Sequence, residues 1–220
     1  MRMNWRRPPV GPPPLPGARK PLHILAVADI ESKFIWEHFD PNLFRGVDLI
    51  LSCGDLKASY LSYLVTMIPA PLFYVHGNHD ASYASKPPQG CESIDGRVVE
   101  FRGLRIAGLG GCIGTDPGNP HQFTEAQMEK RIRKLEGELR RDKHMDIFVS
   151  HAPAAGLGDG VAFHEGYRCF HELYALNQPR VHLFGHIHMG SSPVPGSRQG
   201  VYVSGLTTAF NCAGYRFIDV

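Results

Sequence analysis

The run Pro71-Leu72-Phe73-Tyr74-Val75 is followed, after one residue, by Gly77-Asn78-His79-Asp80. A short apolar run that ends at a glycine is typical of a buried strand. In an open α/β sheet, the residues just beyond the carboxyl end of a strand lie where such folds bind ligands. This stretch therefore predicts a strand that leads directly into a functional turn.

The same arrangement, an apolar run followed by a polar or histidine-bearing turn, occurs four more times. These turns carry Asp29 after residues 22–28, Gly54-Asp55 after 49–51, Ser150-His151-Ala152-Pro153 after 147–149, and Gly185-His186-Ile187-His188 after 181–184. Five turns of one kind predict a single site assembled at the carboxyl ends of several strands.

Between these runs lie segments with helical spacing, and the alternation of strands and helices predicts an α/β fold with parallel strands. The best-marked helix begins at residue 125, because Thr124 and Gln127 form a capping-box pattern. We expect strands at 22–28, 47–51, 72–75, 98–101, 105–109, 147–149, 181–184, 201–204 and 215–218, and helices at 34–44, 58–68, 125–143 and 170–176.

The composition is that of a globular protein, with 43% apolar and 20% charged residues in a chain of 220. No apolar run approaches the roughly 18 residues of a membrane span, so we expect no membrane partner. The five cysteines are odd in number and form no Cys-x-x-Cys pair. They indicate reduced thiols and a cytoplasmic protein rather than a disulfide framework.

The net charge of +2 is unevenly distributed: residues 1–20 carry +5 and the remaining chain carries −3. Six prolines in that first segment predict a disordered Pro/Arg-rich leader, open to a proline-dependent partner or a phosphate. Residues 21–220 are predicted to form one catalytic domain. Its negative charge argues against a nucleic-acid partner.

The turn residues are of the kinds that bind a pair of divalent cations. Such a pair needs a bridging carboxylate, terminal oxygen and nitrogen ligands, and open positions for water and substrate. Asp29 and Glu31 alternate on one extended segment, so both can face the same way. Asp55 can bridge the two ions. The remaining candidates are the Asn78 amide oxygen and the imidazoles of His151, His186 and His188.

In this order, the motifs resemble the calcineurin-like metallophosphoesterase superfamily, and the resemblance covers about residues 22–220. It implies a four-layer α/β/β/α sandwich of two mixed sheets. It also implies a dinuclear-metal phosphoesterase in which a hydroxide bridging the ions attacks phosphorus. His79 corresponds to the family's catalytic histidine and Asp80 to the carboxylate that orients it. The implied ligands are Asp29, Glu31, Asp55 and His188 at one ion, and Asp55, Asn78, His151 and His186 at the other.

Glu31 departs from the family pattern, which has histidine at that position. An additional carboxylate favours Mn²⁺, Fe²⁺ or Mg²⁺ over Zn²⁺. It also lowers the positive charge of the centre, which favours phosphodiesters over dianionic monoesters. The alternative is that Glu31 is not a ligand and that the first ion is bound weakly.

We therefore expect a phosphodiesterase that acts on a small phosphorylated, nucleotide-like substrate. The alternatives are a phosphoprotein phosphatase, a nuclease, or a metal-poor scaffold of the same fold. His164, in the loop after the Ser150-His151 turn, is a candidate for substrate contact. His121 and His182 lie in no motif, and His182 is expected to be a packed or surface residue. The natural substrate and the oligomeric state do not follow from the sequence.

Overall fold

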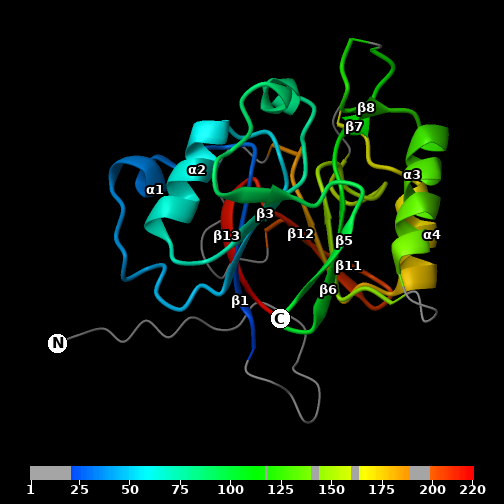
Figure 1. Ribbon diagram of the computed structural model, residues 1–220. Helices are drawn as coiled ribbons and strands as arrows, with labels where there is room; N and C mark the ends of the chain where they lie inside the picture. Colours follow the sequence, from blue (N-terminus) through cyan, green and yellow to red (C-terminus); the bar gives the residue numbers. More distant parts are fainter. Residues whose placement is uncertain (1–20, 117, 140–143, 160–163, 189–198) are drawn as a thin grey trace.

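The computed structural model describes residues 21–116, 118–139, 144–159, 164–188 and 199–220. Two mixed sheets lie face to face, and helices cover their outer faces (Figure 1). Helices α1 (Lys33–Glu37) and α2 (Ala58–Met67) cover one side, and α3 (Glu125–Glu138) and α4 (Cys169–Asn177) cover the other. The predicted four-layer sandwich is confirmed. The leader predicted at residues 1–20 lies outside the described residues.

The first sheet has the strand order β13-β1-β2-β3-β4, and β1 to β4 run parallel. Its last strand in the chain, β13, pairs antiparallel with β1. Because parallel strands end at one edge, the turns after β1, β2 and β3 are neighbours there. The strands are β1 (His23–Ala28), β2 (Leu49–Ser52), β3 (Leu72–Tyr74), β4 (Cys91–Ser93) and β13 (Gly214–Asp219).

The second sheet has the order β11-β12-β10-β9-β6-β5, and its four inner strands are parallel. The turns after β9 and β10 contain the three histidines predicted as ligands. The strands are β5 (Val98–Phe101), β6 (Leu104–Leu109), β9 (Ile147–Ser150), β10 (Val181–Phe184), β11 (Val201–Ser204) and β12 (Thr207–Asn211). A separate pair, β7 (Cys112–Ile113) and β8 (Gln122–Phe123), and the 3₁₀ helix η1 (Asp80–Ala84) complete the described elements.

Each interface between layers has its own apolar core, and β1 shows how the sequence supplies two of them. Ile24 and Ala26 belong to the core between the sheets, whereas Leu25 and Val27 pack beneath α1 and α2. Successive strand side chains point to opposite faces, so a strand covered on both faces reads as a continuous apolar run. This explains why the buried strands are visible in the sequence.

Two helices are shorter than predicted. The helix expected over 34–44 ends at Glu37, because a residue preceding a proline disfavours helix and Asp40 precedes Pro41. The Asp40 carboxylate instead accepts a hydrogen bond from the Asn42 backbone N–H at 2.9 Å, forming a turn. Helix α3 begins with the predicted capping box but ends at Glu138 rather than 143, and residues 140–143 lie outside the described part.

Candidate metal centre

Three predicted ligands have left-handed backbone conformations: φ is 59° at Asp29, 57° at Asp55 and 65° at His186. Each lies within three residues after the end of a strand. A non-glycine residue in a sparsely populated conformation costs roughly 1–3 kcal/mol and persists only where its surroundings enforce it. Such residues gather at functional sites, and here they turn side chains toward the facing edges of the two sheets.

Glycines at the same edge leave room for the two aspartates. A Cβ on Gly77 would lie 2.0 Å from the Asp55 Oδ1 atom, and a Cβ on Gly185 would lie 2.5 Å from the Asp29 Oδ2 atom. Neither position tolerates a side chain without displacing a carboxylate. Glycine is therefore needed here for close approach.

The side chains of Asp29, Asp55 and His151 come together as predicted. Each offers a ligand atom within 4.8 Å of the others. They come from three different strand ends and from both sheets, so this group exists only when the sheets face each other. Asn78 joins it, because its Oδ1 atom lies 3.0 Å from His151 Nε2.

The hydrogen-bond partners of His151 indicate whether a cation fits this group. The imidazole is fully buried, and its Nδ1–H donates to the Cys53 carbonyl oxygen at 2.8 Å. The other nitrogen, Nε2, faces two acceptor oxygens, Asp55 Oδ2 at 3.3 Å and Asn78 Oδ1 at 3.0 Å. Three acceptors converge on one point, which requires a positive species between them: a proton on Nε2 or a metal ion in its place. The donor set therefore fits a metal.

Charge at the group is set by the His151–Asp55 pair. Burial raises the pKa of Asp55, but the hydrogen bond and charge of His151, together with the His79 N–H and ring, outweigh it and lower the pKa to about 2. Burial lowers the pKa of His151, but Asp55 outweighs that effect and raises the pKa to about 9. Asp55 is thus ionised at neutral pH and is available as a bridging carboxylate.

His186 and His188 are anchored to the other aspartate. The backbone N–H of His186 donates to both oxygens of Asp29, at 3.0 and 3.1 Å, and its ring lies 4.9 Å from the His151 ring. Burial lowers the pKa of His186 to about 3, so its imidazole is neutral, the form that binds metals. His188 Nε2 lies 3.7 Å from Asp29 Oδ1, which raises its pKa. His164 contributes a third ring, centred 5.0 Å from His186 and 5.5 Å from His188.

His79 and Asp80 lie beside the group but do not pair with each other in the described contacts. The His79 N–H donates to Asp55 Oδ1 at 2.8 Å, and the exposed ring places Nε2 3.9 Å from Asp55 Oδ2. Asp80 is buried and accepts the N–H groups of Gly77 and Asp55, at 2.7 and 2.9 Å. Burial raises its pKa to about 6. Asp80 thus links the turn after β2 to the turn after β3. Its predicted role in orienting the His79 ring stays a prediction.

Glu31 is placed apart from the ligand atoms that converge. Its Oε1 atom lies 3.4 Å from Lys57 Nζ, a half-buried carboxylate paired with an exposed ammonium. Glu31 does not belong to the described group formed by Asp29, Asp55 and His151. This placement agrees better with the alternative, in which Glu31 is not a direct ligand.

A buried hydrogen-bond chain supports the His151 turn. Ser150 Oγ–H donates to the Ala152 carbonyl at 2.5 Å, so Ser150 Oγ accepts from His182 Nε2–H at 2.6 Å. His182 Nδ1 then accepts from the Tyr174 hydroxyl at 2.5 Å. The sequence gives little indication of these hydrogen bonds, because His182 resembles any packed histidine in a strand. The Cys53 carbonyl could not be predicted at all, since a backbone acceptor has no signature.

The match with known proteins agrees with this geometry. Residues 22–190 match the family described as calcineurin-like phosphoesterase. The chain belongs to that family. Membership carries metal-dependent hydrolysis of phosphoric esters as the family's activity, and the Asp29–Asp55–His151 group offers candidate ligands for such a metal.

Solved structures with low sequence identity share the fold. TT1561 from Thermus thermophilus aligns with a TM-score of 0.60 at 18% identity, covering 88% of this chain and 90% of its own. Another crystal structure gives 0.65 at 14% identity, covering 90% of this chain and 95% of that one. The comparison with curated proteins gave no match. Among the described residues, no helix has both the length and the apolar character of a membrane span.

Proposed function

We propose that the chain is a dinuclear-metal phosphodiesterase acting on small, nucleotide-like substrates. The observation that carries the proposal is the convergence of the Asp55 and Asn78 side-chain oxygens on His151 Nε2, while Nδ1–H donates to the Cys53 carbonyl oxygen. When bound, the ions would supply an acidified water nucleophile and positive charge for the phosphoryl oxygens. The protein's own contribution is to hold the ligands and the substrate in register.

Each aspartate has a distinct place in the proposed centre. Asp55 lies between His151 and His79, so it is the carboxylate proposed to bridge the two ions. Asp29 anchors the His186 turn and faces His188, so it belongs to the other ion. Asn78 completes the His151 side. Its backbone carbonyl accepts from the Asn119 side chain at 2.8 Å, which fixes the turn.

His79 is proposed to give a proton to the leaving oxygen. Its ring is 79% exposed and extends from the turn that also binds Asp55, so it reaches a substrate without being a ligand itself. A general acid must stand within hydrogen-bond reach of the departing group. His164 lies beside the rings of His186 and His188 and is proposed to contact the substrate.

The preference for diesters rests on charge. Carboxylates around two divalent ions reduce the attraction for a dianionic monoester more than for a monoanionic diester. Asp29 and Asp55 supply two such charges, and Glu31 supplies a third nearby charge that Lys57 partly offsets. The ions proposed are Mn²⁺, Fe²⁺ or Mg²⁺, which accept carboxylate and amide oxygens such as those of Asp29, Asp55 and Asn78 as ligands.

The proposal is tested by comparing paired chromogenic substrates. Bis-p-nitrophenyl phosphate and p-nitrophenyl phosphate are hydrolysed by the full chain with Mn²⁺, Mg²⁺ or Zn²⁺ added. We expect a higher kcat/KM for the diester, and the highest rates with Mn²⁺. A clear monoester preference contradicts the diester assignment, and no hydrolysis of either substrate with any of the three ions contradicts the enzyme assignment.

A further inference from the structure

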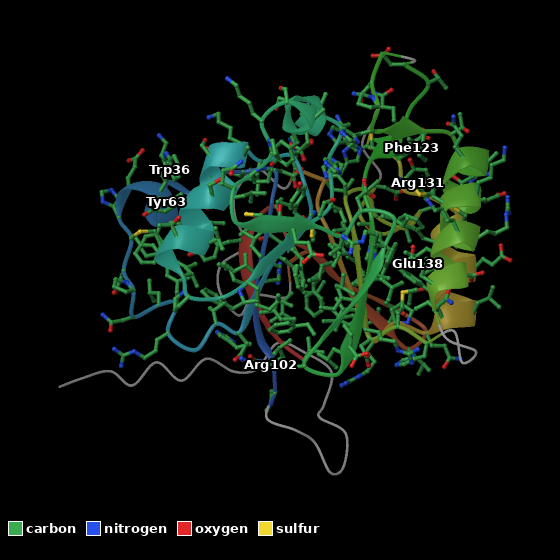
Figure 2. All side chains as sticks on the ribbon, in the orientation of Figure 1. Trp36, Tyr63, Arg102, Phe123, Arg131 and Glu138 are labelled. Carbon is green, nitrogen blue, oxygen red and sulfur yellow. The ribbon has the colours of Figure 1, made fainter. Side chains whose placement is uncertain are left out.

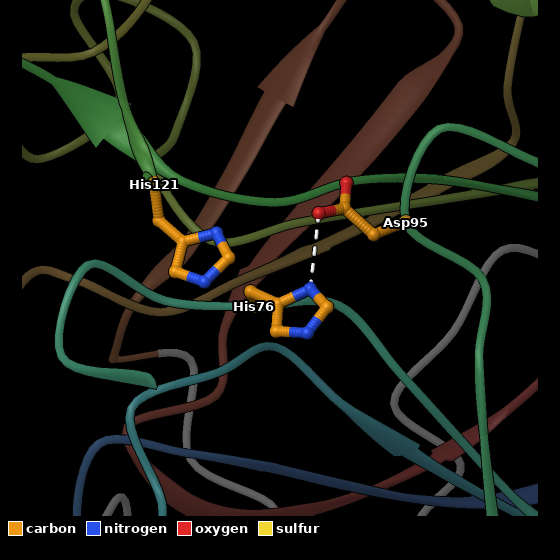
Figure 3. A group of neighbouring side chains, drawn as sticks. All are labelled: His76, Asp95 and His121. Carbon is orange, nitrogen blue, oxygen red and sulfur yellow. Dashed lines mark hydrogen bonds and ion pairs between the residues drawn. The ribbon is translucent and has the colours of Figure 1, made fainter. Parts of the chain in front are cut away.

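A second group of ligand-type side chains lies outside the motifs of the family. His76, Asp95 and His121 each offer a ligand atom within 4.8 Å of the other two (Figure 3). The His76 Nδ1 atom lies 3.1 Å from Asp95 Oδ2, and the two imidazole rings stack with their centroids 4.5 Å apart. His76 follows β3, Asp95 follows β4, and His121 precedes β8, so three separate segments meet here.

One stretch of backbone holds all three residues. The N–H of Gly110 donates to Asp95 Oδ1 at 2.7 Å. The next two N–H groups, of Gly111 and Cys112, donate to the carbonyl oxygens of His76 and His121 at 2.7 and 3.1 Å. The approach is so close that a Cβ on Gly110 would lie 2.4 Å from the His76 carbonyl oxygen, and one on Gly111 would lie 2.5 Å from that of His121. Because three consecutive backbone N–H groups each bind one of these residues, the fold itself fixes the residues next to one another.

The protonation states suit a cation. Burial raises the pKa of Asp95, but the His76 hydrogen bond and the Arg131 charge outweigh it and lower the pKa to about 2. Burial and the neighbouring His76 lower the pKa of His121. At neutral pH the group therefore contains an ionised carboxylate and a neutral imidazole, both competent ligands.

Arg131 occupies the far side of the carboxylate. Its guanidinium pairs with Asp95 Oδ1 and lies 4.2 Å from the centroid of the Phe123 ring. Figure 2 labels Arg131 and Phe123 near α3. Asp95 Oδ2, the oxygen that faces His76, is not the one that binds Arg131 or the Gly110 N–H. Hydrogen bonds to the outer oxygen of a metal-binding carboxylate commonly fix its direction. Arg131 thus orients Asp95 and leaves one oxygen directed into the cluster.

We propose that His76, Asp95 and His121 bind a single divalent transition-metal ion, separate from the centre built on Asp29 and Asp55. Two imidazoles and one carboxylate with further positions open to water are a ligand set that Zn²⁺ accepts in proteins. Ligand bonds of about 2.0–2.2 Å bring ligand atoms somewhat closer together than 4.8 Å. A turn of the His121 ring about its soft outer torsion provides this adjustment.

The bound ion would clamp the turn after β3 to the loop between β7 and β8. That loop also reaches the principal centre, because the Asn119 side chain donates to the Asn78 carbonyl oxygen at 2.8 Å. Occupancy is therefore expected to stabilise the folded chain, since an ion that binds only the native state raises its stability. Metal binding by His76, Asp95 and His121 does not depend on whether the chain hydrolyses diesters.

The test counts ions per chain. The full-length protein is stripped with a chelator, reloaded with Zn²⁺, passed over a desalting column and analysed by elemental mass spectrometry. His121→Phe keeps a ring for stacking but removes the nitrogen ligand, so we expect it to retain one ion fewer than the parent protein. His38→Phe, which changes an exposed histidine at the end of α1, is the matched control and should retain the parental number.

Asp55→Asn separates this site from the principal centre. In that background one ion should remain, and adding His121→Phe should remove it. Co²⁺ loading gives a second readout, since the absorbance of the remaining ion should disappear with the same substitution. An unchanged ion count and unchanged Co²⁺ spectrum in His121→Phe and in His121→Ala would overturn the proposal. Failure of the principal centre would instead appear as an Asp55→Asn variant that loses no ion.

Discussion

At the scale of single residues, the surroundings of His151 Nε2 decide whether a cation fits the candidate centre. The ring is fixed by its Nδ1–H bond to Cys53, so it cannot turn away from Asp55 and Asn78. Without a cation, two acceptor oxygens and a nitrogen lone pair would repel one another in a buried place. A proton on Nε2 satisfies both oxygens, and a metal ion of the proposed centre would take the place of that proton.

Replacing Asp55 by Asn is expected to remove the charge that both proposed ions share. Even the loss of a residue that only supports a ligand costs about 10–100-fold in metal affinity, so a bridging ligand should cost at least about 100-fold. Calorimetric titration with Mn²⁺ measures the affinity. Glu92→Gln, at an exposed carboxylate paired with Arg97, is the control and should bind as the parent does. Equal affinity of Asp55→Asn and the parent protein would show that Asp55 is not a ligand.

Gly77→Ala tests the close approach at the same carboxylate. The added Cβ would lie 2.0 Å from Asp55 Oδ1, so we expect a loss of about 1–3 kcal/mol in the free energy of unfolding, together with weaker metal binding. Gly137→Ala is the matched control, because a Cβ there meets nothing within 4 Å and its position is inside α3. That control should gain roughly 0.5–1 kcal/mol. Urea unfolding measures both, and a Gly77→Ala variant as stable as the parent would contradict the crowding.

At the scale of elements, β9, β10 and α4 are linked by the chain from Tyr174 through His182 to Ser150. These two hydrogen bonds require a neutral His182, since Nδ1 accepts from Tyr174 while Nε2–H donates to Ser150. Burial lowers the pKa of His182 to about 3. The turn that carries His151 is thereby tied to the second sheet by neutral, directed hydrogen bonds.

This pKa predicts how stability changes with acidity. In the unfolded chain His182 takes up a proton below about pH 6.5, whereas in the folded chain it stays neutral down to about pH 3. The unfolded state therefore binds more protons in this window, and folding stability falls as pH falls, by up to about 1.4 kcal/mol per unit. Stability above pH 7 is unaffected by this group.

His182→Gln removes the titration while retaining a polar side chain. We expect the free energy of unfolding of the parent protein to decline more steeply than that of the variant between pH 6 and pH 4. Guanidinium titrations at several pH values measure the two slopes. Parallel slopes would contradict the assignment of a buried neutral His182.

Several elements follow from the sequence because their burial pattern is simple. Strand β1 is apolar throughout and both its faces are covered, and the Thr124–Gln127 capping box marks the start of α3. Strand β12 was missed because Thr207 and Asn211 make it look polar. Both are buried, and their side chains bond to the carbonyl oxygens of Pro179 and Ile187.

The candidate site likewise contains residues that the sequence predicts and contacts that it does not. The ligand motifs were visible because each follows an apolar run, and the structure brings Asp29, Asp55 and His151 together. The contacts of Asp80 and Glu31 could not be predicted, since they depend on which backbone groups and which lysine come near after folding. The proximity of His76 and His121 could not be predicted either, because the backbone of residues 110–112 brings them together only after folding.

At the scale of the whole molecule, the candidate centre lies where the carboxyl ends of strands from the two sheets meet, beside the apolar core between the sheets. Asp29 and Asp55 come from the first sheet, and His151 and His186 come from the second. A metal ion bound across this junction links strands far apart in the chain. Metal binding should therefore stabilise the sandwich as a unit.

Removing metal is expected to lower the melting temperature. An ion at 100 times its Kd contributes about 2.7 kcal/mol. For a chain of this size that corresponds to roughly 5–10 °C, at about 2–4 °C per kcal/mol. Differential scanning calorimetry with EDTA and then with excess Mn²⁺ measures the shift and its reversal. Asp55→Asn should show a clearly smaller shift, and a melting temperature unaffected by chelation would contradict a bound metal.

The most direct measurement is the anomalous scattering of manganese in crystals grown with Mn²⁺. We expect two adjacent peaks at the junction of the sheets. One should lie within about 2–2.5 Å of His151 Nε2, the other near Asp29, and both within that distance of Asp55. Density showing Asp55 and His151 bonded only to each other, with no anomalous peak near either at saturating Mn²⁺, would contradict the proposed centre.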